Sequence, residues 1–339
     1  MILFYAVPIK SIKSSPTHPE GHYFIRNSLF NVQYSLFILH LFQNLHTHTN
    51  FSDGSDDPEK YIEAALIRGL SALGFSDHSP LPFKNTFALK EEETGRYCKT
   101  IAELRKKNQI SSLHETNIKM QNAKGKMQIF LGMEADFIPG IGLSFVYFRD
   151  NFPLDYLIGS VHLVRSGSSS ELWFIDGPDP ATYDDGLNVL FGGNIRKGVG
   201  AYHRQINEML TTRKMDIIGH LDKIKMHNRG RFFSETDPWY IALIEETLEL
   251  VRQSGTIVEV NTRGLYKKRS DSLFPGPMIL KKIHDFNIPV IISSDAHKPF
   301  EVSMLFNETA DLLLEIGFRE LMILTPSGWN TVSLKENSI

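Results

Sequence analysis

Short apolar segments alternate with helical patterns from about residue 36 onward. Seven of these segments are predicted to be buried strands, because they are short apolar runs between helical patterns. They are Leu36–Leu45, Ser71–Ser76, Met127–Gly132, Leu154–Ser160, Met215–Gly219, Thr256–Val260 and Ile288–Ile292, and a shorter apolar run, Leu321–Leu324, comes last. Strands that alternate with helices predict βα units and a parallel sheet. Seven or eight such units favour a closed α/β barrel.

The helical patterns between these strands begin with recognisable signals. Asp57 precedes Pro58, and Asp237 precedes Pro238. An aspartate followed by proline is typical of a helix start, because the carboxylate can cap free backbone N–H groups and proline needs none. A last helical pattern covers about residues 301–316.

Two long segments do not fit a short βα loop. They are Leu81–Lys126, which contains a helical pattern, and Val164–Ala201, which is rich in Gly, Ser, Asp and Pro. Each follows a strand, so we expect both at the face where a barrel places its active site, as insertions that cover a substrate. Residues 36–330 then form one barrel domain. Residues 1–35 show no clear period and are predicted to be a poorly ordered extension.

Composition narrows the possible functions. The chain has 36 Lys and Arg against 39 Asp and Glu, a net charge of −3, which argues against nucleic acid as the partner. No apolar run approaches the roughly 18 residues of a membrane span, and no secretory signal is visible. The single Cys98 cannot form an internal disulfide. We expect a cytoplasmic protein with a small-molecule partner. The sequence does not define an oligomeric state.

Potential metal ligands follow almost every predicted strand. A histidine after a strand is by itself an ordinary surface or hydrogen-bonded residue, but six of the 13 histidines occupy such positions. Together with three carboxylates they are His46, His48, Asp53, His78, Glu134, His162, His220, Asp295 and His297. All are predicted to lie on the same face.

The spacing of these residues suits a metal cluster. Residues i and i+2 of an extended segment point the same way, so His46 with His48, and Asp295 with His297, can face one centre. Neutral imidazole and carboxylate together are typical ligands of Zn, Mn or Fe. Nine ligands exceed the needs of one ion, which predicts two or three divalent ions. Glu134 is a candidate bridge between two of them.

Such a cluster is suited to phosphoester hydrolysis. Two ions about 3.5–4 Å apart can clamp a phosphoryl group, and a metal-bridging hydroxide would attack phosphorus. Candidate cations for the phosphate are Arg165, Arg204, Lys223 and Arg263. The chain contains no P-loop motif, so nucleotide-driven chemistry is not indicated.

The sequence motifs around these residues resemble those of a known family. The pieces HTH, DHSP, GSVH, GHLDKIK, VEVNTRGLYKK and SSDAHKP resemble those of the polymerase and histidinol phosphatase (PHP) superfamily, and their order resembles its histidinol-phosphatase branch. The resemblance covers about residues 41–324. It implies a distorted, TIM-like (β/α)7 barrel with insertions in the βα loops and a trinuclear metal site. The N-terminal extension departs from the family pattern.

The resemblance also implies roles. His46, His48, Glu134 and Asp295 would hold one ion; Glu134, His162 and His220 a second; Asp53, His78 and His297 a third. His46, His48, Glu134, His220 and Asp295 would carry catalysis through these ions. The implied reaction is the hydrolysis of L-histidinol phosphate in histidine biosynthesis, with Arg204 and Arg263 as substrate contacts.

Two other readings stay open. One is a phosphatase or phosphodiesterase of the same superfamily that acts on another small phosphoester. The other is a barrel that binds metal for regulation and catalyses nothing. All nine ligand positions are filled, which favours an enzyme.

Overall fold

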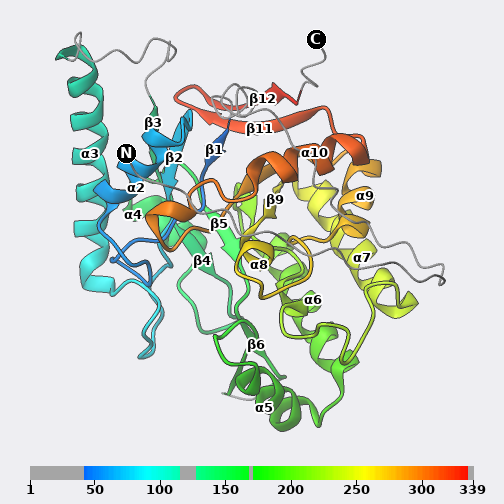
Figure 1. The fold of residues 1–339 in the computed structure, drawn as a ribbon. Helices are drawn as coiled ribbons and strands as arrows, with labels where there is room; N and C mark the ends of the chain where they lie inside the picture. Colours follow the sequence, from blue (N-terminus) through cyan, green and yellow to red (C-terminus); the bar gives the residue numbers. More distant parts are fainter. Residues whose placement is uncertain (1–41, 115–126, 168–170, 335–339) are drawn as a thin grey trace, which may run out of the picture.

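The computed structural model describes residues 42–114, 127–167 and 171–334. Parallel strands form two sheets at its centre, with helices around them (Figure 1). The first sheet has the order β1-β2-β3, formed by Gln43–Asn44, Ala72–Phe75 and Gln128–Leu131. The second has the order β10-β9-β8-β5-β4. Its strands are β4 (Glu134–Asp136), β5 (Ile158–Ser160), β8 (Ile217–Ile218), β9 (Ile257–Asn261) and β10 (Val290–Ser293).

The two sheets are joined at their edges by isolated parallel bridges. One bridge pairs Thr47 with Ala296, and the other pairs His78 with Glu134. The mixed α/β architecture with parallel sheets therefore agrees with the sequence prediction. The closed (β/α)7 barrel stays a prediction, because single bridges rather than continuous ladders connect the sheets within the described residues.

Each of the seven predicted strands overlaps an observed one, although β9 and β10 each end one residue later than predicted, β1 is short and residues 36–41 lie outside the described part. Strand β4 is an addition. The sequence placed Glu134 in the loop after a strand, whereas the structure makes it the first residue of β4.

Nine helices occur in the described residues. They are α2 (Pro58–Ile67), α3 (Thr94–His114), α4 (Phe145–Asn151), α5 (Pro180–Phe191), α6 (Ile195–Thr212), α7 (Pro238–Ser254), α8 (Arg263–Tyr266), α9 (Pro277–Asp285) and α10 (Phe306–Ile316). Proline opens α2, α5, α7 and α9, as expected for the first turn. The helix predicted over 301–316 instead starts at Phe306, after a 3-10 turn at Pro299–Glu301. None of the described helices has the length and apolarity to span a membrane.

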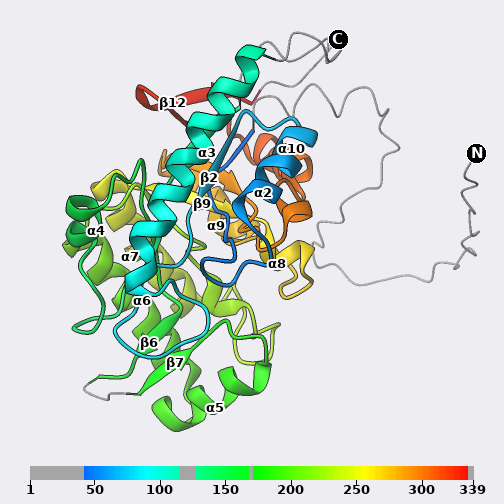
Figure 2. The same cartoon turned by 90° about the vertical axis from the view of Figure 1, so that its left-hand side faces the viewer.

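An antiparallel hairpin lies at the amino-terminal ends of the strands. It consists of β11 (Glu320–Thr325) and β12 (Gly328–Ser333), which the sequence had suggested only as one short apolar run. The Gln43 side chain joins it to β1 by accepting from the backbone N–H of Leu324 and donating to its carbonyl, both at 2.8 Å. In Figures 1 and 2 this hairpin and α5 lie at opposite ends of the molecule.

Tyr156 fills the space between the two sheets. It is completely buried, and its hydroxyl donates to the carbonyl of Leu45 at 2.5 Å. A Cβ at Gly74 or Gly132 would lie 2.3 or 2.2 Å from atoms of the Tyr156 side chain, closer than atoms can pack. Glycine at both positions therefore lets this tyrosine hold the strands in register.

The two insertions differ in what they cover. In the first, α3 packs against β3, and the Tyr97 hydroxyl donates to the carbonyl of Gly132 at 2.9 Å, so this helix covers the sheet. The second forms the antiparallel pair β6 (Leu163–Arg165) and β7 (Leu172–Phe174), followed by α5 and α6, at the end opposite the hairpin (Figure 2). The predicted extension of residues 1–35 lies outside the described residues.

Candidate metal centre

The structure brings all nine predicted ligands together where the parallel strands end. His46, His48 and Asp53 follow β1, and His78 follows β2. Glu134 opens β4, His162 follows β5 and His220 follows β8, while Asp295 and His297 follow β10. The chain thus collects them from the ends of five strands, as the βα arrangement predicts, and from the start of β4.

Glu134 lies at the centre of this cluster and is completely buried. Its Oε2 is 2.9 Å from His78 Nδ1 and 3.3 Å from His46 Nε2. Its Oε1 is 3.0 Å from His220 Nε2 and 3.4 Å from His162 Nε2. One carboxylate therefore contacts imidazoles on both of its sides, which is the geometry that a bridging ligand requires.

A second group surrounds Asp53 nearer the surface. Asp53 Oδ2 is 3.2 Å from His297 Nε2, and Asp53 Oδ1 is 3.8 Å from His78 Nε2. His48 lies between the two groups, with Nδ1 3.9 Å from Asp53 and Nε2 3.4 Å from Asp295. Metal-ligating atoms of His48, Asp53, His78 and His297 all lie within 4.8 Å of one another.

Two of the candidate ligands have left-handed backbone conformations. The φ angle is +23° at His220 and +51° at Asp295. Residues other than glycine rarely adopt such angles, and those that do gather at functional sites where the surroundings hold them. Here the guanidinium of Arg263 donates to the carbonyl of Asp295 at 2.6 Å.

The ligand atoms fit divalent cations. His46 Nε2, both ring nitrogens of His48, His78 Nδ1 and Glu134 Oε2 are buried without a hydrogen bond to any described residue. Leaving so many polar atoms unsatisfied is costly. Cations of the Zn, Mn or Fe class take this mixture of imidazole and carboxylate and would satisfy these atoms.

The protonation tendencies of the cluster agree with this fit. Burial alone would raise the pKa of Glu134, but the surrounding imidazoles hold it well below its ordinary value. Burial would also raise the pKa of Asp295, but the Lys223 ammonium and the other positive groups around it together hold this pKa well below its ordinary value. Burial holds the pKa of His48 well below its usual range. The cluster thus offers ionised carboxylates and at least one neutral imidazole, the forms that bind metals.

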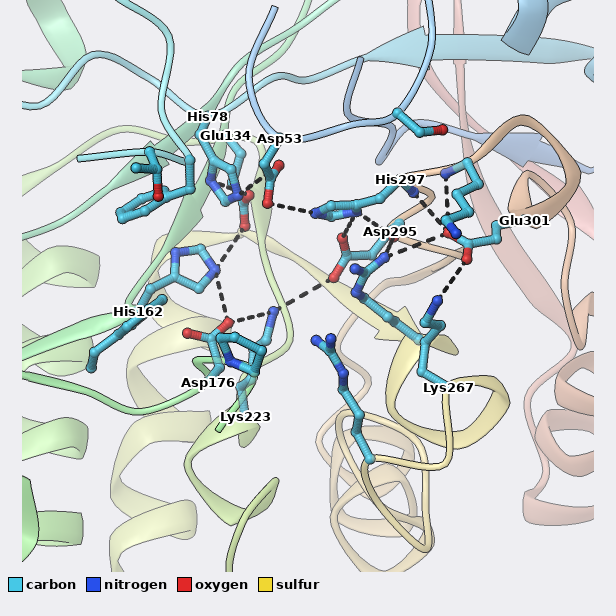
Figure 3. A pocket seen from close by; sticks show the side chains of 18 residues that line it. Asp53, His78, Glu134, His162, Asp176, Lys223, Lys267, Asp295, His297 and Glu301 are labelled. Carbon is cyan, nitrogen blue, oxygen red and sulfur yellow. Dashed lines mark hydrogen bonds and ion pairs between the residues drawn. The ribbon is translucent and has the colours of Figure 1, made fainter. Parts of the chain in front are cut away.

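A pocket of about 430 Å³ opens beside the cluster (Figure 3). Five cationic side chains line it: Lys223, Arg263, Lys267, Arg269 and Lys298. Lys223 Nζ lies between two carboxylates, 3.0 Å from Asp176 and 3.6 Å from Asp295. Positive side chains beside a metal cluster suit an anionic group.

Of the four cations that the sequence suggested for binding the phosphate, two line this pocket, Lys223 and Arg263. Arg204 is exposed on α6, with its guanidinium beside Gly200 of the same helix. Arg165 donates to the carbonyl of Pro139 at 2.6 Å. Neither residue lines the pocket, because proximity in sequence to a strand end does not set which side of the second insertion a side chain faces. Their role as substrate contacts stays a prediction.

Several pocket residues were missed. Phe87 and Phe174 come from the two insertions and stack with ring centroids 5.7 Å apart and planes 18° apart. Asp176 follows β7. Glu301 accepts from the backbone N–H of His297 at 2.9 Å and pairs with Lys267 at 3.0 Å, so it fixes the loop that carries His297 (Figure 3). Asp176 could have been found in the sequence as an acidic residue two positions after the short apolar segment that forms β7.

Fold and site together define an α/β protein with a cluster of metal-ligating side chains beside a cationic pocket. The chain belongs to the PHP domain family, whose model matches residues 44–263. The family assignment that the sequence motifs suggested is confirmed.

Named relatives agree with the predicted branch. A probable histidinol-phosphatase of Deinococcus radiodurans is 29% identical over 278 residues, covering 81% of this chain and 93% of the relative. The histidinol-phosphatase of Bacillus subtilis is 25% identical over 271 residues, covering 77% and 95%.

Solved structures share the fold. The histidinol phosphate phosphatase of Lactococcus lactis, solved with Zn, L-histidinol and phosphate, aligns with a TM-score of 0.58 and 18% identity, over 85% of this chain and 98% of that one. A Listeria monocytogenes protein aligns with a TM-score of 0.65 and 18% identity, over 78% and 99%.

Proposed function

We propose that this protein is a metal-dependent phosphomonoesterase that hydrolyses L-histidinol phosphate to L-histidinol and phosphate. The observation that carries the proposal is the juxtaposition of nine metal-ligating residues with the cationic pocket. Figure 3 shows the members of this group that line the pocket. The histidinol-phosphatases named above, similar over most of their length, support the choice of substrate.

The nine residues grouped around Glu134 and Asp53 would hold two or three ions of zinc, manganese or iron. When bound, such ions polarise the phosphoryl group and lower the pKa of coordinated water. The chain itself supplies the geometry: buried imidazoles and carboxylates whose positions are set before substrate arrives, which is the main requirement of phosphoryl transfer.

The cations of the pocket would hold the phosphate. Arg263 lies against the Asp295 carbonyl, and Lys223 lies between Asp295 and Asp176, so both groups face the edge of the cluster. Arginine offers a planar fork to phosphate oxygens and lysine a point charge. Lys267, fixed by Glu301, adds a further positive charge at the wall.

Other residues of the pocket suit the leaving group. The stacked pair of Phe87 and Phe174 lies next to the His78 ring, with 5.4 Å between the centroids of Phe87 and His78. An aromatic wall accepts an imidazole ring, and each aromatic contact contributes about 0.5–1.5 kcal/mol. The Asp176 carboxylate lines the same pocket and complements an ammonium. An ester that carries both a phosphate and cationic groups matches this combination of cationic, aromatic and acidic side chains.

The test is phosphate release by the purified, Mn²⁺-supplemented protein. We expect kcat/KM for L-histidinol phosphate to exceed that for p-nitrophenyl phosphate by about 100-fold or more, since binding contacts to both ends of the substrate are used. The Asp295→Asn variant controls for contaminating phosphatases. Preference for bis-p-nitrophenyl phosphate, followed as release of p-nitrophenol because cleavage of a diester leaves the monoester and not free phosphate, would identify a phosphodiesterase. Binding of metal without hydrolysis of any of these esters would favour a regulatory barrel.

A further inference from the structure

Glu259 lies on β9 behind the metal centre, outside the pocket. It is completely buried, and its neighbours on the same strand, Val258 and Val260, are apolar core residues. An isolated carboxylate in such a place is costly unless several donors satisfy it. Glu259 has such donors, and two of them belong to candidate metal ligands.

The first donor is the ring of His46. His46 Nδ1 is 2.5 Å from Glu259 Oε1. A proton on Nδ1 leaves Nε2 as the free lone pair, and Nε2 is the atom that faces Glu134 at 3.3 Å and Asp295 at 3.9 Å. The carboxylate therefore selects the imidazole tautomer that can bind a metal with Nε2.

The second donor is the backbone of His220. Its N–H donates to Glu259 Oε2 at 2.8 Å. His220 has the left-handed φ of +23°, which costs energy for a residue with a Cβ. The hydrogen bond to Glu259 offsets part of that cost and holds the histidine ring against Glu134.

Asn261 extends the same arrangement to a third ligand. Its side-chain amide nitrogen is 3.1 Å from Glu259 Oε2 and 3.2 Å from Asp295 Oδ2. The ligating atoms of His46, His220 and Asp295 lie within 4.8 Å of one another. Two consecutive inward-facing positions of β9 thus contact all three members of one potential metal site.

We propose that Glu259 is a positioning residue that orients His46 and His220, and through Asn261 also Asp295, toward one divalent ion. The inference rests on the proposed metal-dependent function for its effect on turnover. Its effect on metal binding is independent of any substrate.

Glu259→Gln is the sharpest variant. Glutamine has the same shape but one acceptor oxygen, whereas His46 Nδ1–H and His220 N–H need two. One of the two contacts must therefore face an NH₂ group. We expect the apparent dissociation constant of the weakest-held Zn²⁺ to rise about 10–100-fold, as is typical when a hydrogen-bond partner of a metal ligand is lost.

The first measurement is chelator competition with Zn²⁺ on the full chain, and the second is the visible spectrum of the Co²⁺-loaded protein. The spectrum reports ligand geometry and does not respond to a merely structural change elsewhere. Thr262→Val is the matched control: it removes a buried hydrogen bond of 2.8 Å to the Met304 carbonyl, next to β9, without contacting a candidate ligand. We expect the control to match the wild type in both measurements.

Wild-type Zn²⁺ affinity and an unchanged Co²⁺ spectrum in folded Glu259→Gln would overturn the proposal. Equal losses in Glu259→Gln and Thr262→Val would do the same. If Glu259→Gln does not fold, Glu259→Asp replaces it. This variant keeps the charge but withdraws both oxygens by one methylene. Wild-type Zn²⁺ affinity with an unchanged Co²⁺ spectrum, or losses equal to those of Thr262→Val, would again overturn the proposal. A wild type that binds Zn²⁺ yet hydrolyses no phosphoester would refute the proposed function and leave this test intact.

Discussion

Asp176 gives the most direct test of how the pocket recognises its substrate. Its side chain is 11% exposed and lines the pocket. Oδ2 pairs with Lys223 at 3.0 Å, while Oδ1 is buried without a hydrogen bond to any described residue. A carboxylate oxygen left in this state is an available acceptor for an ammonium group of the substrate.

The size of the effect follows from that single contact. A hydrogen bond to a charged group is worth about 1.5–3 kcal/mol, which corresponds to about 10–150-fold in kcat/KM. Asp176→Asn keeps the shape of the side chain and removes its charge. Some loss arises because Lys223 is held less firmly, and this part is common to every phosphate ester.

The assay therefore compares two substrates. We expect Asp176→Asn to lower kcat/KM for L-histidinol phosphate about 10–150-fold more than for p-nitrophenyl phosphate, which has no amine. Asp179→Asn, at the exposed first turn of α5, is the control and should change neither value. An equal loss on both substrates would show that Asp176 acts only through Lys223, and no loss on either would remove it from recognition altogether.

The remaining predictions concern the metals, the phosphate contact and a buried histidine. Removal of divalent ions with a chelator should abolish phosphate release, and Zn²⁺ or Mn²⁺ should restore it; full turnover by protein shown to be metal-free would refute the mechanism. Asp295→Asn should lower kcat about 1,000-fold with the fold retained by circular dichroism, and a loss below about tenfold would contradict its role as a ligand. Arg263→Ala should lower kcat/KM about 10–150-fold, through both parameters, because its guanidinium also holds the Asp295 carbonyl at 2.6 Å; unchanged kinetics would return it to a structural role. Burial lowers the pKa of His203 to about 3, so below pH 6.5 the unfolded chain binds the proton that the folded one excludes, and stability falls as pH falls. This histidine should cost about 2 kcal/mol between pH 8 and pH 5, and urea unfolding of His203→Asn should show a pH dependence smaller by that amount; identical slopes for the two proteins would contradict it.

The positions of the candidate ligands were predictable because one rule places them. In parallel βα units, residues directly after the strands meet at one end, so the order of motifs along the chain was enough to group His78, His162 and His220. The same rule does not place Arg204 and Arg165, which are not among the residues that line the pocket. Their orientation depends on how the second insertion folds over the strand ends, and an insertion has no periodicity that fixes the direction of its side chains.

The residues that hydrogen-bond to the candidate ligands could also have been found in the sequence, because they are polar residues within an otherwise apolar strand. Strand β9 is buried along its whole length, with Val258 and Val260 on one face and Ile257, Glu259 and Asn261 on the other. Alternation places Glu259 and Asn261 on the same side, toward the centre of the sheet. A charged residue in a strand with no solvent-facing side requires buried donors, and Glu259 has two of them at histidine-bearing strand ends, in His46 and His220. The two polar residues of IVEVN thus indicate that the metal centre lies beside this strand. They contact the candidate ligands from the strand, on the side away from the pocket.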